Sequence, residues 1–309
     1  MWLTVCAAAG VMATQWALHP ARRSLTLSDE ERAATIAKNN DAEVRQVAIA
    51  VSDGEVLRAW FIRPFKNNGS AVILFHGQAD NRAGMLGPAA LLLRNGYSVL
   101  MPDARAHGMS GGALATYGFM EAEDVRQWFD WLVQMQTPHC IDGLGESMGA
   151  ALLLNSLRSE QGFCAVVAES PFANFREASY ARIGQFAGTG PWLGRTVLRP
   201  AVEFSFLYAR LRYGADLTQD DPAEAVAKSS VPVLLIHGQL DSNLSSHHSE
   251  MILAKSRNRR GEIVLWEPPY AGHCGAASAE PEKFERRVIG WFATHQTASP
   301  TPQSVAGEN

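Results

Sequence analysis

Cysteine is scarce in this chain, and the few cysteines show no metal-binding pattern. Among 309 residues there are four, with no Cys-x-x-Cys spacing: Cys6, Cys140, Cys164 and Cys274. Four cysteines are too few to hold a chain of this length together by disulfides, and their spacing argues against a zinc site. Cys140 and Cys164 begin two expected strands, so a disulfide between them is conceivable. Two separate buried thiols are the favoured interpretation.

The chain also lacks an excess of either charge. It has 27 Lys and Arg against 31 Asp and Glu, a net charge of −4. This balance provides no general attraction to phosphate backbones, so no nucleic-acid partner is expected. There is no internal repeat. With 47% hydrophobic and 19% charged residues, the composition indicates a globular core, and one α/β domain of roughly 250 residues fits the length.

Long apolar runs are absent except at the N-terminus. Residues 2–18 contain no Asp, Glu, Lys or Arg, and such a run is at the short limit for crossing a bilayer. No Lys or Arg precedes it, as a signal peptide would require. An uncleaved membrane anchor is the favoured interpretation of residues 1–23. The alternatives are a start codon assigned too late, or a cleaved signal with a secreted or periplasmic product. Arg22 and Arg23 favour a cytoplasmic domain by the positive-inside rule, but the membrane side stays open.

The remaining pattern predicts an α/β domain over residues 44–295, after a polar connector at 24–43 and before a disordered tail at 296–309. An antiparallel hairpin comes first, with strands near Val47 and Val56–Ile62. Six short apolar runs follow, separated by helix-like segments: Ala71–Phe75, Tyr97–Met101, Ile141–Leu144, Ala165–Ala168, Val231–Ile236 and Ile263–Trp266. This alternation predicts an eight-stranded, mostly parallel sheet with helices on both faces. The long interval 171–230 predicts a helical cap over the strand ends.

The sequence Gly145-Glu146-Ser147-Met148-Gly149 provides the strongest chemical signal. It lies between an expected strand and an expected helix, where a sharp turn would raise the Ser147 hydroxyl above the sheet edge. Glycines at 145 and 149 suit a turn that crowds backbone against backbone. An unreactive serine in an ordinary tight turn is the alternative.

A serine nucleophile needs a base, and the base needs a carboxylate to orient it. His273 follows the last expected strand and is the candidate base, since His19, His139 and His295 are expected away from that edge. Asp241 follows the strand before it, and the order Ser147, Asp241, His273 fits this arrangement. A helix-capping role for Asp241 is the alternative, and Asp220 and Asp221 are weaker candidates for the acid. The backbone N–H groups of Met148 and Gln78 are expected to bind the oxyanion.

At this point the chain resembles the α/β-hydrolase superfamily over most of 44–295. The resemblance rests on five ordered motifs: His76-Gly77, the loop from Pro102 to Gly111 with Asp103, Arg105 and His107, Gly145-x-Ser147-x-Gly149, His237-Gly238-x-x-Asp241, and His273. It is most similar to the bacterial branch of monoglyceride-lipase-like and serine-aminopeptidase-like hydrolases, which includes membrane-tethered members. The resemblance implies an α/β-hydrolase fold with a cap and esterase-type chemistry without metal or organic cofactor. His76, Gly77, Asp103, Arg105 and His107 are expected to organise the site rather than react.

The sequence therefore predicts a serine hydrolase that cleaves a carboxylic ester, amide or thioester of a small acyl substrate through an acyl-enzyme. Two rival hypotheses stay open. The same triad could pass the acyl group to an alcohol, amine or peroxide, as an acyltransferase or perhydrolase does. The fold could also be a non-catalytic ligand-binding protein, although an intact candidate triad argues against this. Nothing in the sequence indicates an oligomeric state.

Overall fold

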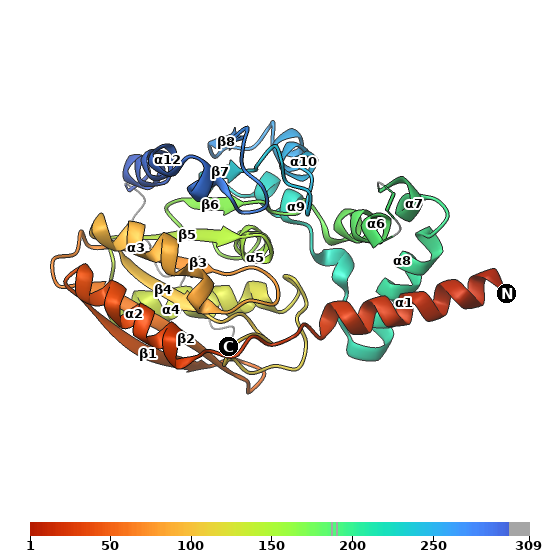
Figure 1. Cartoon of the computed structure of the whole chain (residues 1–309), viewed down its shortest axis with the longest axis horizontal. Helices are drawn as coiled ribbons and strands as arrows, with labels where there is room; N and C mark the ends of the chain where they lie inside the picture. The colour runs from red at the N-terminus through yellow and green to blue at the C-terminus, as the bar shows by residue number, and fades with distance from the viewer. Residues whose placement is uncertain (187, 190, 297–309) are drawn as a thin grey trace, which may run out of the picture.

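An eight-stranded mixed sheet forms the centre of the molecule (Figure 1). Its order is β1-β2-β4-β3-β5-β6-β7-β8. Strands β3 to β8 pair in parallel, whereas β2 is antiparallel to both of its neighbours. The predicted mostly parallel sheet is therefore confirmed. The strands are β1 Ala42–Ala50, β2 Val56–Pro64, β3 Ser70–Phe75, β4 Ser98–Pro102, β5 Cys140–Glu146, β6 Val166–Glu169, β7 Val233–Ile236 and β8 Ile263–Trp266.

The computed structural model describes residues 1–186, 188–189 and 191–296. The segment 296–309, for which disorder is predicted, lies outside these residues except for Gln296.

Helices cover both faces of the sheet and enclose two apolar cores. On one face, buried Trp60 and Leu92 pack with Phe284; on the other, Trp128 and Leu152 are buried. Each such side chain contributes roughly 1.5–3 kcal/mol when it leaves water. The first face carries α2 Leu27–Asn39, α3 Leu86–Arg94 and α12 Pro281–Thr294. The second carries α4 Glu121–Gln136, α5 Met148–Ser156, α9 Pro222–Lys228 and α10 His247–Lys255.

The expected connector at residues 24–43 contains a capped helix, α2, and the start of β1. Thr26 and Asp29 form a capping box, in which the Thr26 hydroxyl accepts from the Asp29 amide and Asp29 accepts from the Thr26 amide. This reciprocal pair satisfies two of the N–H groups that a helix start leaves open. Ala33 and Ala37 are buried on the inner side, so the segment belongs to the layer that covers the sheet.

Three helices occupy the first part of the interval for which a cap is predicted. They are α6 Phe175–Phe186, α7 Trp192–Arg195 and α8 Arg199–Tyr213. Figure 1 shows them at one end of the sheet, beyond α5 and α9, together with α1 Trp2–Leu18. The short 3₁₀ helices are η1 Arg82–Met85 and η2 Leu217–Gln219, and α11 spans Ala276–Ala279.

The N-terminal segment corrects the expectation of a membrane anchor. Residues Trp2–Leu18 form the helix α1, which packs against α8 (Figure 1). Gly10 permits this contact, because a Cβ there would lie 2.6 Å from the Ala201 carbonyl oxygen. The Thr14 hydroxyl lies 3.0 Å from the Ser205 carbonyl oxygen, and the Gln15 amide donates to the Tyr213 hydroxyl over 2.7 Å. Within the described ranges, no helix has the length and apolarity needed to cross a membrane. The predicted membrane anchor is therefore wrong, and the predicted membrane association through residues 2–18 is not supported.

The two cysteines at the start of β5 and before β6 are joined. Cys140 and Cys164 form a disulfide with a Cα–Cα distance of 5.9 Å. The strands are neighbours in the sheet, and the Cys164 amide donates to the Ile141 carbonyl over 2.9 Å. This register brings the two side chains together, so the favoured interpretation of two separate thiols is wrong.

Candidate active site

Ser147 lies on a strained turn between β5 and α5. Its φ angle is +53°, a backbone conformation that costs a non-glycine residue about 1–3 kcal/mol. The turn brings α5 against β3, and a Cβ on Gly149 would lie 2.2 Å from the Phe75 carbonyl oxygen. A Cβ on Gly145 would lie 2.5 Å from Gly149. The spacing of the two glycines thus follows from the close packing that projects the serine.

His273 lies between Ser147 and Asp241. Its Nε2 is 2.9 Å from Ser147 Oγ, and its Nδ1 is 2.7 Å from Asp241 Oδ2. With Nδ1 protonated toward the carboxylate, Nε2 is free to accept the serine proton. The structure therefore brings together three residues from loops that are 32 and 126 positions apart in the chain.

Several donors hold Asp241 as a carboxylate. Burial alone would raise its pKa, but hydrogen bonds from His237, His273 and the Leu244 amide hold the pKa well below the usual range. The Leu244 N–H donates to Oδ1 over 2.8 Å, and the Asn243 N–H does so over 2.9 Å. An ionised Asp241 can stabilise the imidazolium that forms on His273 during proton transfer.

His237 is a residue of this site that sequence reasoning missed. It is fully buried, and its Nε2 lies 2.9 Å from the Leu244 carbonyl oxygen and 3.3 Å from Asp241 Oδ2. Because a carbonyl only accepts, Nε2 must carry a proton, and Nδ1 can then accept from the Ser249 hydroxyl at 2.8 Å. The signal was present in the His237-Gly238-x-x-Asp241 motif, where four-residue spacing places both side chains on one loop.

The two expected oxyanion donors flank Ser147. Met148 begins α5, and Gln78 follows β3 in the neighbouring loop. No hydrogen bond among the described residues uses either backbone N–H, which leaves both groups available to a ligand. The Gln78 side chain is fixed, because its Nε2 donates to the Tyr117 hydroxyl over 2.6 Å. Tyr117 was not among the predicted site residues.

The motif loops around the site are held by buried polar contacts. His76 Nδ1 lies 2.7 Å from the Gly77 carbonyl oxygen, and Nε2 accepts from the Ala104 amide at 3.0 Å. Asp103 accepts from the Arg82 and Met109 amides. Burial lowers the pKa of both His76 and His107 to about 4, so both rings are neutral near pH 7. The supporting role expected for His76, Asp103 and His107 stays a prediction, and their buried positions leave room for it.

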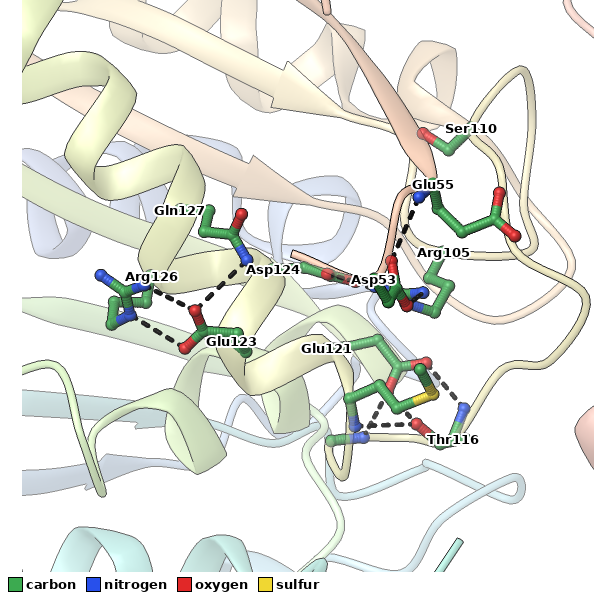
Figure 2. A network of polar contacts seen from close by, with 12 residues as sticks. Asp53, Glu55, Arg105, Ser110, Thr116, Glu121, Glu123, Asp124, Arg126 and Gln127 are labelled. Carbon is green, nitrogen blue, oxygen red and sulfur yellow. Dashed lines mark hydrogen bonds and ion pairs between the residues drawn. The ribbon is translucent and has the colours of Figure 1, made fainter. Parts of the chain in front are cut away.

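Two sets of polar contacts lie beside each other in Figure 2, one around Arg105 and one around Glu121. Arg105 donates to both oxygens of Asp124 over 2.9 and 2.6 Å, and it also pairs with Asp53. In the same view Glu121 accepts from the Thr116 amide and hydroxyl, both at 2.6 Å. The bidentate contact of Arg105 with Asp124 is a strong, directional one. Glu121 also accepts from the Gly118 amide, so it holds the residues on both sides of Tyr117, whose hydroxyl meets Gln78.

Two carboxyl groups beside Ser147 were also missed, the half-buried Glu146 and the buried Glu169. Glu146 ends β5 and is paired in register with Glu169 at the end of β6. Burial, followed by the nearby charges of Glu169 and Asp80, raises the pKa of Glu146 to about 8. Burial raises the pKa of Glu169 to about 7, although the Ala276 amide and the nearby His273 oppose the shift. Glu169 also accepts from the Ala276 amide over 2.9 Å. Near pH 7 the Glu146 carboxyl is therefore expected to hold its proton.

Two hollows meet at Ser147. The first, the apolar cavity, has a volume of about 480 Å³ and is lined mainly by apolar side chains of α1, α6 and α8. The second has about 660 Å³, and we call it the polar hollow because charged and polar side chains, which include His19, Asp80, Glu146 and His273, line it beside apolar ones such as Trp16 and Pro20. His19 was expected away from this edge, and its place in the polar hollow corrects that expectation. In the described part of the chain, no three His, Cys, Asp or Glu side chains are grouped to hold a metal ion.

Comparisons with known proteins find similarity to one family, to uncharacterized bacterial proteins and to a solved esterase structure. The profile of the Alpha/beta hydrolase family matches residues 72–287. Uncharacterized protein YqkD of Bacillus subtilis is 28% identical over 214 residues, which cover 68% of this chain and 68% of YqkD. Uncharacterized protein YfhR of Escherichia coli is 27% identical over 229 residues, or 71% of this chain and 70% of YfhR. The esterase Pf2001 of Pyrococcus furiosus superposes with a TM-score of 0.71 at 24% identity, covering 91% of this chain and 99% of that structure. At 24% identity this structural similarity shows a shared fold and nothing about function.

Proposed function

Because the chain belongs to the alpha/beta hydrolase family, we propose that it hydrolyses carboxylic esters through an acyl-enzyme formed on Ser147. The fold itself was predicted correctly. The observation that carries the proposal is the continuous hydrogen-bonded series from Ser147 Oγ through His273 to Asp241, with distances of 2.9 and 2.7 Å. The narrower resemblance to monoglyceride-lipase-like or serine-aminopeptidase-like enzymes stays a prediction.

The geometry supports the following course of reaction. His273 Nε2 takes the proton from Ser147 Oγ as the oxygen attacks the ester carbonyl carbon. The carbonyl π electrons move to oxygen, and the amides of Gln78 and Met148 donate to this oxyanion. When the carbon–oxygen bond to the alcohol breaks, the imidazolium returns its proton to the leaving alkoxide. The acyl group is then an ester of Ser147.

The second half repeats the first with water. His273 accepts a proton from water, the hydroxide oxygen attacks the acyl carbon, and the carboxylic acid leaves as the proton returns to Ser147 Oγ. Asp241 remains ionised throughout and stabilises the imidazolium. Its low pKa fits this role, because a protonated acid would orient the ring less firmly.

The proposal is tested by labelling the whole chain with a fluorophosphonate, which reacts with activated serines. We expect the parent and a Ser179→Ala control to be labelled and to hydrolyse p-nitrophenyl esters. Ser179 is the matched control, because it also lines the apolar cavity and its hydroxyl donates to the Phe175 carbonyl instead of to a histidine. Ser147→Ala should lose all labelling, and His273→Ala and Asp241→Asn should lose at least about 1,000-fold in kcat. Turnover by Ser147→Ala near the parent rate would refute the proposal.

A further inference from the structure

The N-terminal helix provides one wall of the apolar cavity. Ala13, Trp16 and Ala17 of α1 face this space, and Ala178 of α6 and Val202 of α8 line it with them. Ser147 and Met148 also line the cavity. It is of the size that binds small organic ligands, about 300–1,000 Å³. A helix that closes such a cavity next to a nucleophile determines what can occupy it.

The position of His273 assigns the two hollows to the two halves of an ester. His273 must reach the leaving alcohol to return a proton, and it lines the polar hollow. The alcohol therefore leaves through the polar hollow. The acyl chain must extend to the other side of Ser147, where the lining is apolar and His273 is not among the lining residues described.

The volume of the apolar cavity indicates how long an acyl chain it can hold. At roughly 30 Å³ for each water-sized group, a butyryl group would fill only about a third of the space of about 480 Å³. A longer hydrocarbon chain would displace more water and contact more of the wall, so binding favours it.

The last turn of α1 is also tied to the oxyanion loop. The Tyr117 hydroxyl donates to the Ala17 carbonyl over 2.8 Å and accepts from Gln78 Nε2 at 2.6 Å. The Ala115 amide donates to the Leu18 carbonyl over 2.9 Å. The wall of the cavity and the loop that carries an oxyanion donor are thus joined by one buried hydroxyl.

On these grounds we propose that the apolar cavity is an acyl-chain site for esters with a chain longer than butyryl, and that α1 is the element that determines this specificity. The inference rests on the proposed function, because it requires an acyl group on Ser147. In this proposal the N-terminal helix binds substrate through Ala13 and its neighbours. It can do so only while α1 is packed against α8.

Tryptophan substitutions on α1 test the assignment. Ala13→Trp would place an indole inside the cavity, whereas Ala8→Trp adds the same group to the exposed side of the same helix. We expect Ala13→Trp to lower the ratio of kcat/KM for decanoyl over acetyl p-nitrophenyl ester at least tenfold. Ala8→Trp should leave the ratio unchanged. An equal ratio in the two variants would overturn the proposal.

A second pair of variants tests docking. Gly10→Val forces a side chain against the Ala201 carbonyl, and Ala8→Val is its exposed match. We expect Gly10→Val, but not Ala8→Val, to reduce the decanoyl-to-acetyl ratio about fivefold or more. If Ala13→Trp fails to fold, Ala178→Trp fills the cavity from α6 and carries the same expectation.

Fluorophosphonate labelling of the parent and of each variant separates a failure of the proposed esterase function from a failure of the acyl-chain site. A parent that is not labelled and not active refutes the proposed function. A labelled parent with no preference for decanoyl over acetyl esters, or with a preference that none of the cavity variants changes, refutes only the acyl-chain site.

Discussion

Replacing Glu146 with glutamine should make the protein more stable at alkaline pH. The pKa of Glu146 is raised from 4.5 to about 8, first because the group is buried and second because Glu169 and Asp80 lie close to it. Between these two pH values the folded protein holds a proton that the unfolded chain releases. The free energy of unfolding of the parent must therefore fall as pH rises from about 4.5 to about 8.

The size of the effect follows from the same values. The interval from 4.5 to 8 corresponds to about 5 kcal/mol, because each tenfold change in a proton equilibrium is about 1.4 kcal/mol. Glu146 faces the polar hollow, where water screens its charge, and Glu169 competes with it for a proton. We therefore expect the free energy of unfolding of Glu146→Gln to exceed that of the parent by about half of this value, about 2.5 kcal/mol, at pH 9. At pH 4.5 the gain should be absent.

Urea unfolding of both proteins at pH 5, 7 and 9 measures this difference. Glu224→Gln is a control of opposite sign, because hydrogen bonds from Lys255 and Lys228 lower the pKa of Glu224 to about 2. That variant should be less stable than the parent at pH 7 and 9. A Glu146→Gln difference that is the same at pH 5 and pH 9 would refute the reasoning, since it would mean that Glu146 ionises alike in both states.

Three further predictions concern activity and the disulfide. The kcat/KM of the parent should decline above about pH 8, because the negative charge of ionised Glu146 opposes the oxyanion. An equal decline of kcat/KM in Glu146→Gln between pH 8 and 10 would contradict this. Tyr117→Phe should lower kcat for acetyl and decanoyl esters by a similar factor of about 5–30, since the Gln78 side chain loses its partner; a change in KM alone would argue against positioning. Cys164→Ala should lower the free energy of unfolding by about 3 kcal/mol, as expected for its separation of 24 residues from Cys140. Dithiothreitol should lower the free energy of unfolding of the parent by the same amount and leave that of the variant unchanged. If dithiothreitol lowered both values equally, the disulfide would be excluded as the cause.

The fold could be predicted from the sequence because a parallel sheet buries both faces of each strand. This burial produces short, continuous apolar runs such as those of β3 and β7, which are recognised without knowing their partners. The candidate triad could be predicted for a related reason: parallel strands bring their following loops to one edge. Ser147, Asp241 and His273 each follow a strand, and the structure places them within hydrogen-bonding distance.

Features that depend on register were outside the reach of the sequence. Glu146 and Glu169 interact because β5 and β6 pair Gly145 with Ala168 and Glu146 with Glu169. A slip of one residue would turn one of the two carboxyl groups to the opposite face of the sheet. The disulfide depends on the same pairing. Nothing in either strand's own sequence determines its register against the other, so neither contact could be predicted locally.

The misinterpretation of α1 has a physical cause that also points to its remedy. A helix that lies on protein along one side and is exposed along the other can be as free of charge as a membrane span. Its buried residues, Cys6, Gly10, Thr14 and Leu18, are mostly small, and small residues allow close approach of helices in either environment. Thr14 and Gln15 carry the distinguishing information, because their polar groups are matched by α8. Polar side chains that recur within a short apolar helix therefore indicate a protein partner, and here that partner closes the cavity beside Ser147.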